Sequence, residues 1–389
     1  MKSVIGAKIR MERLKLNYSQ EGLCKGICTV SYLSKIEQGQ VEAGEIIIQL
    51  LFQKLHISFH MEEEFLKEAG KLIDNLYEEF YSFGDLTHLQ KELKLKKREY
   101  LNSPYLLDAL LFLGMESNQE GEELDQYIPC MKQKQYEVYL CMQCMKGIDK
   151  SQELLCLNPN AYYMTQLGIL RCQKGQYVEA LELLLKGYEL CSKEGYVTGM
   201  LYAQNFLGNS YAGLNKYELM LRSYKVAAQI AKALKEDEFI SQINYNIGSS
   251  LLEWNQVQQA KEYLDQCDQK SILYYQKYTI CLEKLGEHEL AAKTLQDGYR
   301  LFQDANEVKE ESEEALLAFK KMYEVVEYRL SHKGYLNEEE YEEILFDCIT
   351  YLKEVMPVGY AKFHIPYYIE VLEKKRRYKE IYKILKEFS

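Results

Sequence analysis

Residues 19–39 read SQEGLCKGICTVSYLSKIEQG, and this stretch decides how the N-terminal part of the chain folds. Ser19 precedes a short helical pattern over residues 20–25, and its hydroxyl suits an N-cap that accepts a hydrogen bond from a backbone N–H of the first turn. Residues 26–28 form a tight turn. A further helix is expected over residues 29–38, where Gly39 supplies a C-terminal stop. The stretch therefore predicts two short helices joined by a tight turn.

Helical patterns on both sides of this stretch can close a small core around it. Residues 5–14 predict a helix that turns Ile5, Ile9 and Leu14 inward and leaves Lys8 and Arg10 outside. Residues 43–55 predict a strongly apolar helix whose expected core residues are Ile46, Ile47, Leu50, Leu51 and Leu55. Two short helices joined by a tight turn, followed by a closing helix, form the layout of a helix-turn-helix.

The motif in this stretch resembles a known family. Ser19-Gln20-x-x-Leu23, followed by Ser31-Tyr32-Leu33-Ser34-Lys35-Ile36-Glu37-x-Gly39, is similar to the XRE (Cro/C1-type) family of phage-repressor-like DNA-binding domains. In that family the Ser-Gln pair opens the second helix and the later run forms the recognition helix. The resemblance covers about the first 58 residues. The chain departs from the usual pattern at Cys24, where Ala is commonest, and in a turn that is one residue shorter, with Cys28 near the expected Gly.

The resemblance implies a DNA-binding surface at the start of the recognition helix, because its first residues meet base edges in the major groove. Hydroxyl groups there can meet several bases, Val30 can touch a thymine methyl group, and Lys35 can reach guanine or a phosphate. Residues on the earlier helices are expected to contact phosphates or to brace a base contact. The candidate DNA-binding residues are Gln20, Thr29, Val30, Ser31, Tyr32, Lys35, Lys8 and Arg10.

The charge distribution agrees with a polyanion at the N-terminal end. Residues 1–60 carry eight Lys or Arg and five Glu, a net charge of +3, whereas the whole chain has a net charge of −11. A mildly basic N-terminal part on an acidic body can offer one small face to DNA and repel it elsewhere. Double-stranded DNA is therefore the expected partner of residues 1–60, although a plain four-helix packing unit without a ligand is the alternative.

The sequence after this domain repeats with a period of 40 residues. Leu167-Gly168, Leu207-Gly208 and Ile247-Gly248 keep this spacing, as do the sets Tyr177, Tyr217, Val257; Ala180, Met220, Ala260; and Leu184, Tyr224, Leu264. This order is the tetratricopeptide pattern, in which small residues let two antiparallel helices approach and large residues fill the groove between them. A fourth unit is expected from Leu282, Gly286, Ala291 and Leu295.

We therefore expect an all-α chain with a four-to-five-helix helix-turn-helix domain over residues 1–60. A right-handed tetratricopeptide-like helical solenoid follows over residues 61–389. The clearest repeats span 161–300, and residues 311–389 form capping helices, because terminal units must hide their outer faces. Pro357 and Pro366 are expected to break the C-terminal part into separate helices.

A concave surface suited to an extended peptide is what tetratricopeptide repeats imply, lined mainly by the first helix of each unit. Asn205 and Asn209 lie one helical turn apart and share a face. An Asn amide can donate to a peptide carbonyl and accept from a peptide N–H, so a row of amides can hold a peptide backbone. The alternative is that these polar residues simply line a solvated surface and bind no ligand. The candidate peptide-binding residues are Gln166, Tyr202, Asn205, Asn209, Gln242, Tyr245, Asn246 and Ser249.

Composition and motifs argue against other classes of protein. No apolar stretch is long enough to cross a bilayer and the N-terminus lacks the apolar core of a secretory signal, so a cytoplasmic protein with reduced cysteines is expected. Cys141 and Cys144 form an isolated CxxC, for which a structural role is favoured over zinc. His56 and His60 lie one turn apart before Glu62, without a complete ligand set. We expect no enzyme, no cofactor and no metal.

Both parts together resemble the peptide-pheromone-responsive regulators of Gram-positive bacteria, the PlcR, PrgX and Rgg kind. That resemblance implies a homodimer on a two-fold-related operator and a short peptide in the groove that alters DNA affinity. Two alternatives stay open: a DNA-binding regulator controlled by a protein partner, and a repeat scaffold that does not bind DNA. The repeats alone also resemble those of the Rap response-regulator phosphatases, which carry no such N-terminal domain.

Overall fold

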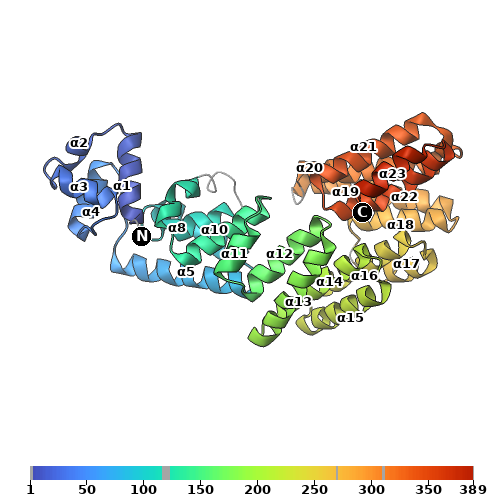
Figure 1. Cartoon of the computed structure of the whole chain (residues 1–389), viewed down its shortest axis with the longest axis horizontal. Coiled ribbons are helices and arrows are strands. Elements are labelled where there is room, and N and C mark those ends of the chain that lie inside the picture. The colour runs from blue at the N-terminus through green and yellow to red at the C-terminus, as the bar shows by residue number, and fades with distance from the viewer. Residues whose placement is uncertain (1–2, 116–122, 269, 309–311, 389) are drawn as a thin grey trace. The chain divides into compact units, whose positions relative to one another are not determined.

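The computed structural model describes residues 3–115, 123–268, 270–308 and 312–388. Over these ranges the chain consists of helices and their connections, without a strand, so the predicted all-α class is confirmed. It divides into two compact units, Met1–Met164 and Thr165–Ser389. The domain boundary predicted at residue 60 falls inside the first unit. Figure 1 shows the order of the helices along the chain.

The first unit begins with the four predicted helices, α1 (Val4–Lys15), α2 (Gln20–Cys24), α3 (Val30–Glu37) and α4 (Glu45–Lys54). Side-chain caps set three of their starts, the first being Ser3 Oγ, which accepts from the Gly6 N–H at 3.4 Å. Ser19 Oγ accepts from the Gly22 N–H at 2.9 Å, and Thr29 Oγ1 accepts from the Tyr32 N–H at 3.2 Å. The common core is formed by the buried residues Ile9, Leu23, Leu33, Ile36, Ile48, Leu51, Phe52 and Leu55.

Three of the expected core residues lie outside this core. Leu14 is 53% exposed and Ile46 is 75% exposed, and Leu50 is exposed as well. The reason is helical geometry: α4 turns Ile48 and Phe52 inward, and residues two positions earlier point to the opposite side of the helix. An apolar run by itself therefore did not show which face of α4 is buried.

The remainder of the first unit is a second helical bundle. It contains α5 (Glu63–Ser82), α6 (Thr87–Leu95), α7 (Lys97–Leu101), α8 (Leu106–Gly114), the 3-10 helix η1 (Asp125–Cys130), α10 (Gln133–Met145) and α11 (Ser151–Leu157). Helix α8 is central, with eight of its nine residues buried. The η1 segment packs against α1, where the Cys130 thiol lies 3.9 Å from the Ser3 carbonyl oxygen. The N-terminal four helices are thus fastened to this bundle through α1.

The second unit is built from helix pairs, which Figure 1 shows following one another along the chain. The pairs are α12 (Ala161–Gln173) with α13 (Tyr177–Glu194), α14 (Val197–Gly213) with α15 (Tyr217–Leu234), α16 (Asp237–Glu253) with α17 (Val257–Leu264), α18 (Ile272–Lys284) with α19 (His288–Val308), α20 (Glu313–Ser331) with α21 (Glu339–Val355), and α22 (Val358–Lys374) with α23 (Tyr378–Glu387). A short 3-10 turn, η2 (Tyr335–Asn337), precedes α21.

Close helix packing explains the 40-residue repeat. A Cβ placed on Gly168 would lie 2.7 Å from Leu184, one on Gly208 would lie 2.6 Å from Tyr224, and one on Gly248 would lie 2.7 Å from Leu264. Side chains larger than hydrogen would push the two helices of a unit apart, because protein interiors have few voids to absorb the shift. The predicted pairing of small and large positions is confirmed in all three units.

Gly286 plays a different part from the one its place in the fourth unit predicted. Nothing lies within 4 Å of a Cβ built on it, and its φ is +79°. It matches Gly175, Asn215 and Asn255, which also have positive φ and connect the two helices of their units. Glycine and asparagine tolerate this left-handed backbone better than other residues. The expectation of a helix-packing glycine at position 286 was therefore wrong.

The last helix pair returns to the first one within the second unit. A Cβ on Gly175 would lie 2.8 Å from Val358, and the Lys362 ammonium lies 4.9 Å from the centre of the Tyr177 ring. Pro357 precedes α22 as predicted, but Pro366 lies inside that helix rather than breaking it. A proline removes one backbone N–H, and α22 continues past that loss with most of its inner face buried.

Candidate functional site

The N-terminal end of α3 gathers most of the residues predicted to read DNA. Thr29, Val30, Ser31 and Lys35 are exposed, and Tyr32 is half-buried against the core. Leu33 and Ile36 on the other side of the helix are buried, so the helix has one packed face and one free face. The free face presents two hydroxyls, a small apolar side chain and an ammonium group within two turns.

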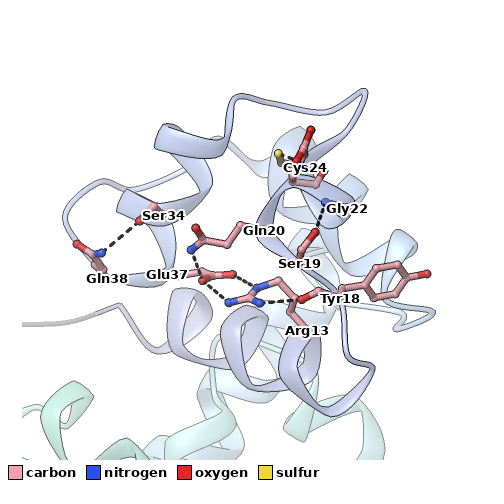
Figure 2. A network of polar contacts seen from close by, with 10 residues as sticks. Arg13, Tyr18, Ser19, Gln20, Gly22, Cys24, Ser34, Glu37 and Gln38 are labelled. Carbon is pink, nitrogen blue, oxygen red and sulfur yellow. Dashed lines mark hydrogen bonds and ion pairs between the residues drawn. The ribbon is translucent and has the colours of Figure 1, made fainter.

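A buried ion pair holds this helix in place, as Figure 2 shows. Arg13 Nε donates to Glu37 Oε1 at 2.6 Å, and Arg13 NH2 donates to Glu37 Oε2 at 3.0 Å. The remaining Arg13 nitrogen, NH1, donates to the Tyr18 carbonyl oxygen at 2.8 Å. The hydrogen bond to Glu37 raises the pKa of Arg13. A bidentate pair of this kind fixes orientation as well as distance, so α1 and α3 cannot rotate freely against each other.

Gln20 belongs to the same network. Its amide Nε2 donates to Glu37 Oε2 at 2.8 Å, which connects the start of α2 to the end of α3. The side chain is half-buried. This contact connects Gln20 to the recognition helix, while the prediction that Gln20 contacts a phosphate or braces a base contact stays a prediction. Arg13 was not among the residues predicted from the sequence. The one indication of its role was Glu37, an acid at the end of a buried helix face that needs a basic partner.

Gly6 sets the separation of α1 and α3. A Cβ built at this position would lie only 2.0 Å from the Ile36 carbonyl oxygen, which is backbone and cannot move aside cheaply. Gly6 is therefore needed for the close approach that lets Arg13 reach Glu37. This residue was also missed, since a single glycine inside a helical pattern ordinarily only weakens the helix.

Lys8 does not face solvent, contrary to the prediction. It is 5% exposed, its ammonium lies 3.8 Å from a Glu12 carboxylate oxygen, and burial lowers its pKa. The physical reason is that η1 packs against α1 and covers the face on which Lys8 lies. Lys8 is therefore not free to meet a DNA phosphate in this structure. Arg10, on the other hand, is exposed as predicted.

The polar residues predicted to line the repeats come from α12, α14 and α16. Gln242 is exposed, and Gln166, Tyr202, Asn209, Tyr245, Asn246 and Ser249 are half-buried. Asn246 Nδ2 donates to Asn205 Oδ1 at 3.4 Å, and the Tyr224 hydroxyl donates to Asn209 Oδ1 at 2.5 Å. One hydrogen bond therefore joins the polar row of amides on α14 to that on α16, whereas Asn209 bonds to Tyr224 on α15.

Asn205 departs from the expectation of an open amide. It is 2% exposed, because the neighbouring helix α16 covers it and Asn246 occupies its oxygen. Asn209, one turn further along α14, keeps its Nδ2 group available, since only its oxygen takes part in the contact with Tyr224. A ligand on this surface would therefore meet Asn209 directly and Asn205 only through Asn246.

Comparison with family models assigns the N-terminal part. Residues 9–60 match the model described as helix-turn-helix, HTH_3. The N-terminal domain is a helix-turn-helix domain of the XRE type. This agrees with the position of α2 and α3, whose connection contains Gly26 with a φ of +82°.

Comparison with solved structures concerns the fold of most of the chain. A Rap protein complexed with Competence and Sporulation Factor has a TM-score of 0.54 and 13% identity, over 79% of this chain and 98% of that one. Bacillus thuringiensis PlcR in complex with the peptide PapR7 and DNA has a TM-score of 0.33 and 16% identity, over 75% and 99%. Aspartyl phosphate phosphatase F from Bacillus subtilis has a TM-score of 0.41 and 17% identity, over 95% and 94%. The likeness to the Rap protein shows a shared helical fold. A search of curated proteins gives no significant sequence match.

The cysteines and histidines were the residues that could suggest other chemistry. All eleven cysteines are free thiols; Cys141 and Cys144 are buried inside α10, and burial raises the pKa of Cys141. In the described part of the chain, no three His, Cys, Asp or Glu side chains are grouped so that they could hold a metal ion. Among the same residues, no helix is long and apolar enough to cross a membrane.

Proposed function

We propose that this chain is a sequence-specific DNA-binding transcriptional regulator whose helix-turn-helix domain reads an operator through α3. The observation that carries the proposal is the exposed end of α3, with Ser31 and Lys35 free and the helix itself held by the Arg13–Glu37 pair. Preorganisation of this kind lowers the cost of ordering the surface on binding. Thr29, Val30 and Ser31 then read base edges, while Lys35 and Arg10 contact guanine or phosphate.

Gel-shift binding of the full chain to DNA from its own upstream region, across a salt series, tests this function. Specific retardation that weakens steeply with salt is expected, since neutralised phosphates release counterions. Lys35→Ala should weaken binding by about 1–3 kcal/mol if it contacts a guanine. Lys67→Ala removes an exposed lysine on α5, outside the helix-turn-helix domain, and should change nothing. Equal loss in both variants, or no specific retardation at all, would leave the domain as a packing unit and favour a scaffold.

We further propose that the repeats sense a short signalling peptide and mediate homodimerisation. Support comes from the polar row on α14 and α16, and from the fold shared with a protein whose structure contains Competence and Sporulation Factor. Asn209, Gln242, Tyr245, Asn246 and Ser249 would bind the peptide backbone, with Gln166 and Tyr202 at the edge. Binding that differs between two shapes of the array would change DNA affinity, in proportion to that difference.

A further inference from the structure

A group of buried polar atoms without partners lies in the second unit. Both amide atoms of Gln276, both ring nitrogens of His364, the Arg329 NH1 group and the Tyr341 hydroxyl are buried and have no hydrogen-bond partner among the residues that the structure describes. The Arg329 guanidinium nevertheless acts on the Tyr341 hydroxyl and opposes the rise in its pKa that burial causes. These residues come from α18, α22, α20 and α21. Buried polar atoms in native proteins nearly always have a partner, because an unmade hydrogen bond leaves the cost of desolvation uncompensated. Several such atoms on neighbouring helices therefore need an explanation.

Lys277 on α18 lies within the same region. It is only 3% exposed, and its ammonium lies 2.9 Å from the centre of the Phe363 ring. Among the described residues, no hydrogen bond or ion pair is formed by this ammonium group. Burial lowers the pKa of Lys277 to about 7, with Glu253 opposing and Arg329 adding to that shift. A lysine without an acceptor is an expensive arrangement that native proteins tolerate mainly at functional sites.

Arg329 on α20 and His364 on α22 also belong to this group. Both contact aromatic rings of one segment of α22, which contains Phe363 and Tyr367. Arg329 donates to Glu283 through Nε at 2.9 Å and through NH2 at 2.6 Å, which leaves NH1 unused. Its guanidinium lies 4.5 Å from the centre of the Tyr367 ring. His364 is 0% exposed, its pKa is lowered well below the usual value by burial, Lys277 and Arg329, and its ring is 5.4 Å from that of Phe363. Basic groups on two other helices, Lys277 on α18 and Arg329 on α20, thus both act on the His364 ring and lower its pKa.

The charges in this region do not balance. The basic groups here are Lys277, Arg329 and Lys362, whereas the acids that act on them are Glu253, whose own pKa burial raises to about 7, and Glu283. Glu283 is already engaged by both oxygens with Arg329, and Glu253 lies beyond ion-pair distance of Lys277. A negatively charged ligand group would therefore be stabilised beside Lys277 and Arg329, and a cationic ligand is disfavoured by Coulomb repulsion.

The group continues the proposed peptide surface. Gln242, Asn246 and Ser249 follow one face of α16, and Glu253 is the next residue on that face. Glu253 is exposed, its carboxylate opposes the lowering of the pKa of Lys277, and its own pKa is raised to about 7. Tyr367, which is half-buried, covers Arg329 and also reaches solvent, so a ligand would approach past this ring.

We propose that Lys277, Arg329 and His364 form a subsite that binds a carboxylate group of the peptide ligand. The inference rests on the proposed peptide-sensing function and deepens it. The carboxylate accepts from the Lys277 ammonium, from Arg329 NH1 and from one ring nitrogen of His364, whose neutral form carries one N–H. Gln276, with a free donor and a free acceptor, suits an amide group of the same peptide.

The carboxylate can be the peptide's C-terminus or an acidic side chain, and a peptide library distinguishes the two. A pool of randomised synthetic heptapeptides with free C-termini, and a matching pool with C-terminal amides, are passed over the immobilised full-length protein. Mass spectrometry of the retained peptides then gives the enrichment. Loss of retention in the amidated pool identifies the C-terminus, whereas enrichment of Asp and Glu in both pools identifies a side chain.

Three variants separate the subsite from the groove as a whole. Lys277→Met keeps the length of the side chain without charge and should reduce the preference for the carboxylate at least tenfold, while peptides still bind. Lys277→Arg should keep the preference. Lys293→Met removes an exposed lysine on α19 and should leave it unchanged. Circular dichroism of each variant checks that the helices are intact.

Two results would contradict the subsite. They differ in whether they also contradict the proposed peptide-sensing function. If the wild-type protein retains peptides regardless of carboxylates, or if Lys277→Met keeps the full preference, the subsite is wrong and peptide binding stands. If the wild-type protein enriches no peptide from either pool, the subsite and the proposed peptide-sensing function both fail.

Discussion

Two buried polar clusters in this chain use the same kinds of side chain and differ in how completely they are satisfied. In the helix-turn-helix domain, all three side-chain nitrogens of Arg13 donate hydrogen bonds, two to Glu37 and one to the Tyr18 carbonyl. Gln20 donates a further hydrogen bond to Glu37. In the second unit, Arg329 NH1 and the side-chain nitrogens of His364 and Gln276 have no hydrogen-bond partner among the described residues. The first cluster is complete within the chain, and the second is not.

The difference separates structural from ligand-binding use of buried charge. A satisfied network gains little net stability over an apolar core but specifies one arrangement, which a recognition helix needs. An unsatisfied cluster costs stability in the free protein, and a ligand that supplies the missing acceptor recovers that cost on binding. Variants that leave the first cluster incomplete, or remove the charge from the second, test this comparison directly.

Glu37→Gln would make the complete cluster incomplete and should have the largest effect. Arg13 would then be a buried guanidinium without a carboxylate, which costs about 3–5 kcal/mol. Hydrogen exchange of the backbone amides of α1, α2 and α3 measures the loss, because it reports this domain separately from the repeats. Glu42→Gln, at an exposed position of the same domain, is the control and should leave exchange unchanged. Similar exchange in both variants would show that the ion pair does not hold the domain together.

Gly6→Ala tests the geometry on which the same cluster depends. The added methyl group would meet the Ile36 carbonyl oxygen at 2.0 Å, so α1 must move away from α3 and stretch the Arg13–Glu37 contact. Overpacking of this kind costs about 1–3 kcal/mol. The control is Gly44→Ala, since nothing lies within 4 Å of a Cβ at that position. Faster exchange in the α1 and α3 amides is expected for the first variant only; equal rates in both would contradict the role given to Gly6.

The sequence predicted the helices and repeats well because both depend on local pattern. Ser19 and Thr29 act as caps where the pattern required them, and Gly168, Gly208 and Gly248 pack where the 40-residue spacing placed them. The motif also identified the helix-turn-helix domain before its geometry was known.

The burial of individual polar residues could not be predicted from the sequence, because it depends on contacts between distant segments of the chain. Lys8 reads as an outward residue on α1, and only the packing of η1, more than a hundred residues later, buries it. Asn205 is covered in the same way by α16. The cluster at Lys277 draws on four helices, and no spacing along the chain connects Lys277 with Arg329 and His364. Helical periodicity identifies an inner face but not which of its polar residues find partners.

Lys277→Met removes the charge from the incomplete cluster and should stabilise the free protein, by about 1–2 kcal/mol near pH 7. In the wild-type protein the pKa of Lys277 is lowered from 10.5 to about 7, with Glu253, Arg329 and Cys348 as the charged or titratable groups that act on it. Between these values the unfolded chain binds a proton that the folded chain does not, so the wild-type free energy of unfolding rises with pH through this group. The variant lacks that rise, so its advantage should have its full size below pH 7 and shrink as the pH rises toward 10.5. Urea unfolding of both proteins at pH 6.5, 8 and 9.5 measures the difference, and Lys293→Met should track the wild type throughout. An advantage that is constant with pH, or a destabilised variant, would mean that Lys277 is satisfied inside the chain, and the contrast between the two clusters would disappear.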